Sequence, residues 1–315
     1  MTAIDSKALA AREKMAAKHS AARNQISKGS NLVFNIMLVV ACVLIIFPLW
    51  IIIVSSVTSE TALKAYGYRL WPVEFSGNAY SYLFREGSVI LTAYKNTLIA
   101  TGVGTVLSVV TVGLYAYALS RPDFKFKKFF TFFSFFTMLF GGGMVSYYNM
   151  CRSVLNLKDT VWALFLPMSF SAYWVIIMRT FYQSSVPEAI IESARIDGSG
   201  EWRTLLQIVC PLAVPGFATV GLFSAVGIWN DFRNCLLLND NAQFYNLQYT
   251  IYQTMNNIKF LKENAARMGG VNVANLPEET FRMAMAVVTV GPIIMAYPFF
   301  QRYFVKGLTV GAVKG

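Results

Sequence analysis

The sequence has few of the residues that carry most enzyme chemistry. It contains one histidine, His19, and only 14% of its residues are charged, against roughly 25% in an average soluble protein. Because His19 lies in a polar N-terminal stretch, Ser-His-Asp and Cys-His catalytic arrangements beside the apolar segments are excluded. No stretch fits the G-x-x-x-x-G-K-[ST] phosphate loop, so the chain is not expected to bind ATP itself.

Cysteine is also scarce. The four cysteines have no paired spacing and no histidine beside them, which disfavours both a disulfide framework and a zinc site. We therefore expect no metal and no cofactor in this chain. The cysteines are Cys42, Cys151, Cys210 and Cys235.

Apolar residues are abundant. They make up 56% of the chain, aromatics make up 15%, and the mean hydropathy is +0.49, which is typical of an integral membrane protein. The net charge of +11 would suit nucleic acid in a soluble protein, but no basic stripe with interleaved aromatics occurs. Lysines and arginines at the cytoplasmic ends of membrane spans explain the charge better, so no nucleic-acid partner is expected.

The apolar residues are concentrated in six windows without Asp, Glu, Lys, Arg or His. Each is near the roughly 20 residues that a helix needs to cross a bilayer. The sequence therefore predicts an all-α membrane protein with six transmembrane helices. The windows are Gly29–Ser59, Asn96–Ser120, Phe129–Cys151, Thr160–Met178, Thr204–Asn230 and Met283–Gln301.

Six crossings place both termini on one side of the membrane. Positive charge is densest in the short connections on the side of the basic N-terminus, which indicates that both termini are cytoplasmic. The predicted organisation is a basic tail (1–30), a six-helix transmembrane domain (31–305) and a cytoplasmic C-terminal tail (306–315). Within the domain, residues 185–211 face the cytoplasm and residues 231–282 face outward.

The cytoplasmic segment 185–211 is charged and has strong helix signals. Ser185 and Glu188 have the spacing of a capping box, with Pro187 in the first turn. Gly198 can take the left-handed conformation that ends a helix, and Ser199 can cap a second one. These features predict a rigid helix–Gly–helix knob on the aqueous face, where another protein can bind it.

The same segment resembles the EAA loop of ABC-importer permeases. The matching residues are Glu192-Ser193-Ala194, Gly198 and Ile208 to Pro211, with Ser193 and Cys210 as departures from the pattern. The resemblance implies a coupling helix that docks into a groove on a cytoplasmic ATPase; an ordinary helix hairpin is the alternative. The expected coupling residues are Glu192, Ser193, Ala194, Arg195, Asp197, Gly198 and Pro211.

The resemblance extends over nearly the whole chain. It includes the A-x-S-R sequence that ends at Arg121, the F-G-G-G of Phe140–Gly143 and a V-K-G terminus, and is closest to carbohydrate-uptake permeases of the maltose type. It implies the type I importer permease fold in a bacterial cell membrane. The implied partners are a second, homologous permease subunit, two ATPase subunits that bind ATP and Mg, and an extracellular solute-binding protein that delivers an oligosaccharide.

Aromatic and amide residues near the predicted spans are candidates for the substrate path. Aromatic faces stack on sugar rings while amides bind hydroxyl groups, although an interfacial aromatic belt would have the same composition. Gly141–Gly143 either break a helix that lines a cavity or lie at its outer end. The amide-rich segment 231–282 suits carbohydrate, a docked binding protein or plain solvation. The candidates are Tyr147, Tyr148, Asn149, Tyr173, Trp174, Trp229 and Asn230.

Three other functions share part of this pattern. A permease for a non-sugar solute would look similar. A secondary transporter driven by an ion gradient usually has carboxylates or histidines within its spans and inverted repeats, whereas the six windows have no charge. A membrane hydrolase would need a histidine or a carboxylate pair within a span. We therefore expect a transport subunit that is not itself an enzyme.

Overall fold

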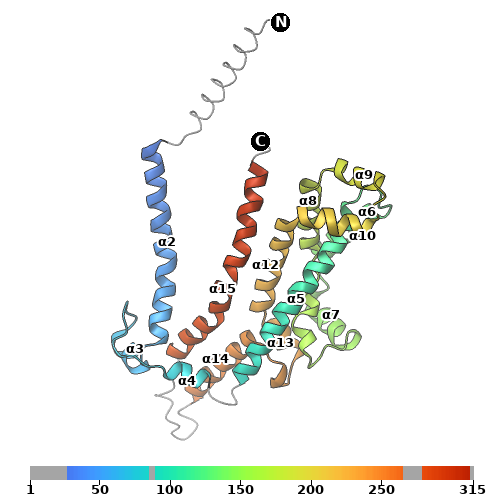
Figure 1. Cartoon of the computed structure of the whole chain (residues 1–315). Coiled ribbons are helices and arrows are strands. Elements are labelled where there is room, and N and C mark those ends of the chain that lie inside the picture. The colour runs from blue at the N-terminus through green and yellow to red at the C-terminus, as the bar shows by residue number, and fades with distance from the viewer. Residues whose placement is uncertain (1–26, 85–88, 265–278, 313–315) are drawn as a thin grey trace.

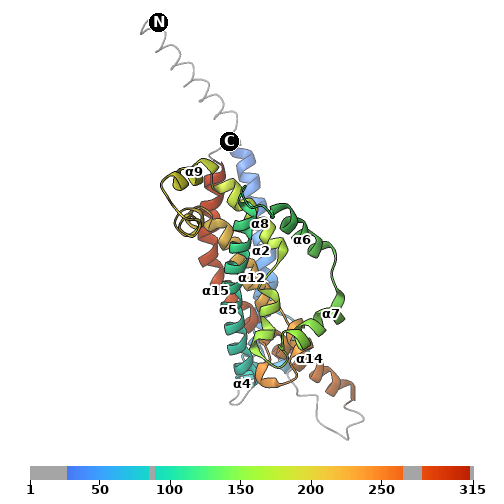
Figure 2. The same ribbon diagram turned by 90° about the vertical axis from the view of Figure 1, so that its right-hand side faces the viewer.

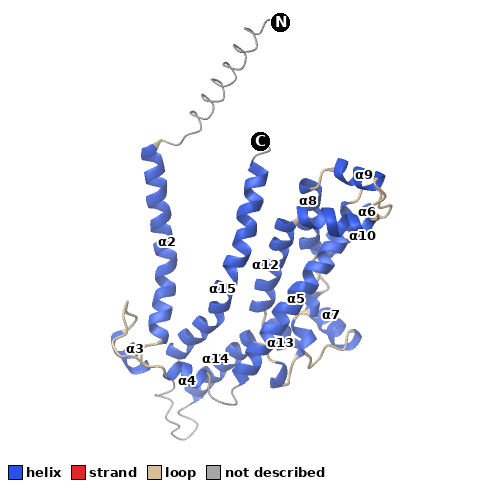
Figure 3. Ribbon diagram, in the orientation of Figure 1, coloured by secondary structure: helices blue, strands red, loops and turns tan. Residues whose placement is uncertain are grey.

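The computed structural model describes residues 27–84, 89–264 and 279–312, and these residues form helices joined by loops with no β-strand element (Figure 3). The predicted all-α class is confirmed. The predictions for the first 26 residues and for residues 313–315 lie outside the described residues. Helix α15 (Glu279–Ala312) continues through most of the predicted C-terminal tail.

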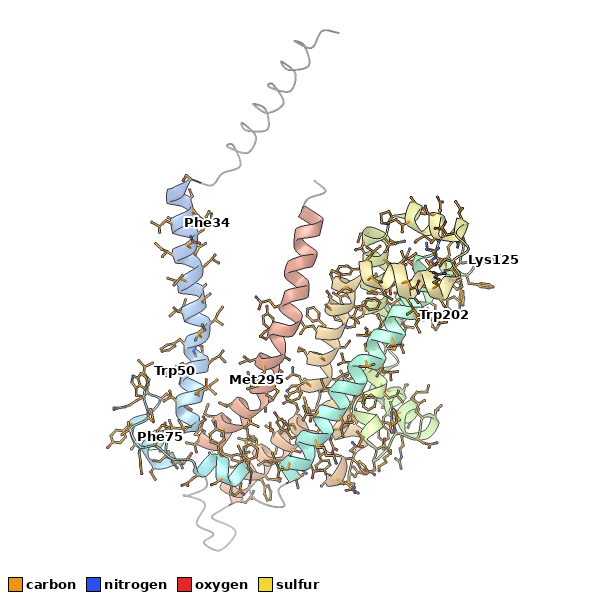
Figure 4. All side chains as sticks on the ribbon, viewed as in Figure 1. Phe34, Trp50, Phe75, Lys125, Trp202 and Met295 are labelled. Atoms are coloured by element: carbon orange, nitrogen blue, oxygen red, sulfur yellow. The ribbon has the colours of Figure 1, made fainter. Side chains whose placement is uncertain are left out.

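Three long helices satisfy the length and hydropathy of a membrane span: α2 (Lys28–Ser56), α5 (Val89–Ser120) and the first 20 residues of α15. Helix α2 stands apart from α5 and approaches α15 at its lower end (Figure 1). None of its spanning window is buried, and side chains along it such as Phe34 are exposed (Figure 4). An apolar helix exposed on this scale needs lipid or another protein around it.

The other three predicted spans are not continuous helices. Phe129–Cys151 divides into α6 (Lys127–Leu139) and α7 (Gly143–Asn149), continued by the π-helical turn η1 (Met150–Val154), and the two parts meet at 116°. The glycines between them have no side chain to favour a helix, and Gly143 has a φ of +77°. The predicted break of the helix at these glycines is thus confirmed, while the cavity that it would line stays a prediction.

The windows Thr160–Met178 and Thr204–Asn230 are also bent, by 51° and 79°. The first comprises the 3₁₀ turns η2 (Val161–Leu164) and η3 (Leu166–Met168) followed by α8 (Ala172–Ser185). The second comprises α10 (Glu201–Thr204), η4 (Leu205–Val209), α11 (Cys210–Leu212) and α12 (Val214–Asn230). Pro215 lies in the first turn of α12, where a proline is tolerated because the backbone N–H that it lacks would have no partner within the helix. If each bent pair counts as one, the described residues contain six spans.

Helices α5, α8 and α12 form the packed centre. Gly104 of α5 lets the side chains of Phe165 and Ile228 approach so closely that a Cβ would lie 2.7 Å from each. Ser108 and Ser224 share a buried hydrogen bond of 2.9 Å between α5 and α12. Gly104 thus permits a close helix contact that a larger residue would prevent, whereas Gly102 faces open space.

The end of the molecule where α2 ends and α15 begins carries the short helices α3 (Glu60–Tyr66), α4 (Asn78–Leu83) and α13 (Arg233–Leu238), the 3₁₀ turn η5 (Ala242–Phe244) and α14 (Leu247–Asn264) (Figure 1). Segment 231–282 is therefore largely helical where it is described, and not a solvated loop. Three of its amides are buried: Asn234, Asn239 and Asn246. Asn239 donates to the carbonyl oxygens of Thr160 and Phe244, and Asn246 donates to that of Asp231.

Glu60 of α3 caps the start of α15. Its Oε2 accepts from the backbone N–H and the hydroxyl of Thr280, at 3.0 and 2.8 Å, and Lys64 lies 3.2 Å from its Oε1. A carboxylate at this position satisfies orphan N–H groups and interacts favourably with the helix dipole. Burial alone would raise the pKa of Glu60, but the hydrogen bonds from Thr280, Lys64 and Glu279 outweigh it and hold the pKa below its usual value.

Acid should weaken this contact. Because the pKa of Glu60 is lower in the folded protein than in the unfolded chain, its contribution is complete above about pH 4.5 and disappears as the pH falls through the folded value. We expect the contribution to be about 1 kcal/mol at neutral pH. Hydrogen exchange of the first turn of α15, compared between wild type and Glu60→Gln, should differ at neutral pH and converge under acid. A difference that persists at pH 3 would contradict this assignment.

Candidate functional site: the coupling knob and the substrate path

The predicted knob is present, with different caps from those expected. Helix α9 (Glu188–Ile196) begins after Pro187, and no side chain caps it, because Ser185 still belongs to α8. The predicted capping box is therefore wrong. Ser199 does not cap the second helix either, because Gly200 occupies the N-cap position and α10 begins at Glu201. The chain turns back toward the membrane spans between these two helices.

Gly198 ends α9 as predicted. Its φ is +76°, and its N–H donates to the carbonyl of Arg195, while the N–H of Ser199 donates to that of Ala194. This pair of bonds is a Schellman motif, which satisfies the last carbonyls of a helix and favours glycine at the left-handed position. The fixed glycine of the motif thus sets the angle at which α9 is presented.

An ion-pair network holds the knob against the end of α5. Arg195 bridges Asp123 (2.5 Å) and Glu201 (3.1 Å), so it joins α9 to both the 121–126 turn and α10. The Tyr117 hydroxyl of α5 donates to Glu201 Oε2 at 2.6 Å. Arg121, which is buried, lies 3.7 Å from the same oxygen and over the Tyr117 ring. Arg195 was predicted to contact the ATPase; it forms these ion pairs within the chain while 45% of its side chain stays exposed, and the ATPase contact remains a prediction.

The outer face of the knob is apolar and exposed. The side chain of Ile196 is 87% exposed and that of Trp202 is 68% exposed, and Trp202 projects from this end in Figure 4. Beside them, Ala189, Ser193 and Ile208 line a shallow concavity of about 380 Å³. Apolar side chains in this number on an aqueous face are typical of a protein-binding surface. Ile196 and Trp202 were not among the residues predicted from sequence, although their position beside Gly198 could have indicated them.

The other predicted coupling residues divide between the surface and the core. Glu192, Ser193, Asp197 and Pro211 are exposed, whereas Ala194 is buried against the chain. Ser193 donates its hydroxyl to the Ala189 carbonyl within α9. The exposed members are available to a partner, and Ala194 fits as a small residue that allows α9 to pack closely. Among the described residues, no three His, Cys, Asp or Glu side chains gather as metal ligands would.

The predicted path residues are dispersed. Trp174 stacks on Phe223 at 5.0 Å, beside Tyr173, whose side chain is 51% exposed. Trp229 is buried and donates its indole N–H to the Thr289 carbonyl, so it offers no face to a sugar ring. Asn230 donates to the Val226 carbonyl within α12 and accepts from Gln248. The proposed Trp229–Asn230 pair therefore does not act as a stacking platform in this conformation.

Tyr147, Tyr148 and Asn149 lie together on α7, where Tyr148 accepts a hydrogen bond from Arg152. Tyr147 donates to Oδ1 of the fully buried Asn234 at 2.6 Å. This contact fixes the broken third span against α13. Tyr147 is thus a structural residue in this conformation, whatever else it contacts.

Removal of the Tyr147 hydroxyl should destabilise the protein. In Tyr147→Phe the Asn234 oxygen loses its donor while it stays buried, which costs about 1–3 kcal/mol. Thermal unfolding of the purified variant should therefore begin at a lower temperature than that of wild type. Tyr148→Phe, which removes an exposed hydrogen bond, is the matched control and should change stability little. Equal stability of the Tyr147 variant would contradict the proposed role.

Comparisons with known proteins agree with this architecture. Residues 19–310 match the family described as binding-protein-dependent transport system inner membrane component. The chain is 35% identical over 286 residues to the polygalacturonan/rhamnogalacturonan transport system permease protein YtcP of Bacillus subtilis (strain 168), covering 90% of this chain and 96% of that protein. It is 27% identical over 297 residues to the melibiose/raffinose/stachyose import permease protein MelC of the same organism, covering 92% and 98%.

A solved structure resembles the chain over a similar length. It is a bacterial ABC transporter involved in the import of the acidic polysaccharide alginate, with 26% identity and a TM-score of 0.74, covering 89% of this chain and 99% of that chain. A knob that can bind a partner, bent membrane spans and a match along nearly the whole chain therefore agree. The chain belongs to the binding-protein-dependent transport system inner membrane components, the permease subunits of ABC importers, in which separate subunits hydrolyse ATP.

Proposed function

We propose that this permease takes up a carbohydrate, specifically an oligosaccharide, that an extracellular solute-binding protein delivers. The observation that carries the proposal is the similarity over almost the full length to permeases whose names specify polygalacturonan and rhamnogalacturonan, or melibiose, raffinose and stachyose. The likeness to an alginate importer supports it independently. A non-sugar solute is the alternative, and the transport assay below distinguishes the two.

The proposed assembly contains a second, homologous permease subunit and two ATPase subunits that bind ATP and Mg. The exposed helix α2 supports the second permease, because a span with none of its window buried in its own chain can pack on another. The exposed apolar face of the knob, formed by Ile190, Ile196 and Trp202, supports an ATPase groove as its partner. The knob and both termini then lie in the cytoplasm, and segment 231–282 faces the binding protein.

In this assembly the ATPase changes the conformation of the permease only through its contact with the knob. Closure of the two ATPase subunits would bind one orientation of the knobs better than the other and so shift the permease between inward-open and outward-open states. The network of Arg195, Glu201 and Tyr117 joins the knob to α5, which packs on α12 and α8. A displacement of the knob would therefore move the packed centre.

The test is transport by the reconstituted complex in sealed vesicles. Uptake of labelled uronic-acid and galactosyl oligosaccharides, with the binding protein outside and ATP inside, should require both. Uptake driven by an ion gradient without ATP would support the secondary-transporter alternative. Uptake of amino acids or peptides in preference to every sugar tested would support the non-sugar alternative.

A further inference from the structure

A loop rich in aromatic and apolar residues lies beside the end of α2 that is away from the knob. It comprises residues 67–75, between α3 and α4, and is called the aromatic loop below. The loop rises beside the lower end of α2 (Figure 3). Helix α9 of the knob and α4, which follows the loop, lie at opposite ends of the molecule (Figure 2). The aromatic loop therefore belongs to the membrane side opposite the knob.

Contacts at its tip and at its base fix the aromatic loop to α2. At the tip, Trp50 of α2 donates its indole N–H to the Leu70 carbonyl at 3.0 Å. The Trp50 ring also packs edge to face on Trp71, with ring centroids 5.6 Å apart. At the base, Phe75 forms an isolated antiparallel bridge with Thr58, just after the end of α2. Trp50 and Phe75 accordingly lie at the same end of α2 (Figure 4). The loop thus runs along the last turns of this helix.

The length of α2 places these contacts near the lipid headgroups. At 1.5 Å per residue, the 29 residues of α2 span about 43 Å, which matches the roughly 40–45 Å of a bilayer with both headgroup regions. The hydrocarbon core is about 30 Å thick, so each headgroup region extends over roughly 5–8 Å. Trp50 lies six residues, or about 9 Å, before the end of α2 at Ser56. Trp50 and the tip of the loop therefore lie at the boundary between headgroups and hydrocarbon.

The composition of the aromatic loop suits that boundary. The side chain of Trp71 is 72% exposed and that of Phe75 is 76% exposed, so both rings are available to lipid. Residues 67–74 form neither helix nor strand, and their backbone groups therefore need water. Water is present among headgroups but absent from the hydrocarbon core. Arg69, whose guanidinium lies over the Tyr66 ring, supplies a cation for the phosphates. Tryptophan, tyrosine and arginine on solvated backbone are typical of a membrane interface.

We propose that the aromatic loop is embedded in the headgroup region of the leaflet opposite the knob and binds phospholipid there. The rings of Trp71 and Phe75 insert among the upper parts of the acyl chains, while Arg69 faces the phosphates. The loop thereby anchors the end of α2, a helix that is exposed along its whole spanning window. Because the loop covers only this end of α2, the rest of the helix stays available to a second permease subunit. The proposal is independent of the solute that the transporter carries.

The test is photochemical cross-linking in the complete transporter complex. The photoreactive residue p-benzoylphenylalanine replaces either Trp71 or Tyr252, an exposed aromatic residue of α14 at the same end of the molecule. The complex is reconstituted in phosphatidylcholine vesicles with the binding protein outside, and its adducts are identified by mass spectrometry after illumination. We expect position 71 to form at least about five times as much phospholipid adduct as position 252.

Tryptophan fluorescence is a second measurement, and it needs only the mild variant Trp71→Phe. The emission that this variant lacks relative to wild type should be quenched at least about twofold by phosphatidylcholine brominated close to the headgroup, and less by lipid brominated at the chain ends. Equal phospholipid adducts at positions 71 and 252, or no quenching by either lipid, would overturn the proposal. A predominant adduct of position 71 with the binding protein would overturn it in favour of a delivery surface, and one with the second permease in favour of a subunit contact.

Discussion

Ile196→Asp should abolish transport by separating the permease from its ATPase. The Ile196 side chain is 87% exposed at the end of α9 and has no packing role within the chain. Burial of such a side chain in a partner's groove contributes about 1.5–3 kcal/mol, and an unpaired carboxylate in the same position adds a desolvation cost of several kcal/mol. Because each 1.4 kcal/mol is a factor of ten in affinity, we expect a loss of at least about a hundredfold.

The measurement is copurification of the ATPase with the tagged permease, together with ATP-dependent uptake in vesicles. Ile196→Met keeps an apolar side chain and should bind and transport nearly as wild type does. Thermal unfolding of the isolated Ile196→Asp permease should be unchanged, which separates lost docking from lost folding. If the aspartate variant retains the ATPase, the partner does not bind this face of the knob.

The knob could be predicted from sequence because its shape is local. Gly198 ends α9 in a Schellman motif, and this geometry depends on a few consecutive residues. The predicted caps failed for a related reason. A serine near the start of a helix does not fix the residue at which the helix begins. In the folded chain α8 extends through Ser185, and α10 starts beyond Ser199.

The partners of the knob could not be predicted, because they are distant in sequence. Tyr117 and Glu201 are 84 residues apart, and nothing in either segment indicates the other. The sequence showed Arg195 as a charge on an aqueous loop, which suggested an external partner. Only the folded chain brings Asp123 and Glu201 to it.

The membrane spans show the same limit. Hydropathy located α2, α5 and α15 well, since a continuous apolar helix needs no tertiary information. Hydropathy could not show that the other three windows bend, because a charge-free window has the same hydropathy whether it forms one continuous helix or two helices at an angle. Hydropathy also could not show the direction of individual side chains: Trp229 lies near the end of α12 and is turned into the core, where it donates to the Thr289 carbonyl.

Glu201→Ala should leave the ATPase bound but uncouple it from transport. Glu201 is the shared acceptor through which Tyr117 of α5 and Arg195 of α9 are joined. Without it the knob can move on its ATPase while α5 does not follow. Coupling free energies between sites are typically 1–3 kcal/mol, so we expect ATP-driven uptake to fall by about tenfold or more at unchanged copurification of the ATPase.

The readout that identifies this role is the number of ATP molecules hydrolysed per sugar transported, which should rise. A residue that only stabilised the fold would lower transport and hydrolysis together. Glu188→Ala is the matched control, because it removes an exposed carboxylate from the same knob that makes no hydrogen bond with the described residues. Tyr117→Phe removes the 2.6 Å bond from the other side and should reproduce part of the defect. If Glu201→Ala transports with wild-type stoichiometry, force must reach α5 by packing alone, through Tyr182 of α8, whose ring contacts Tyr117 edge to face.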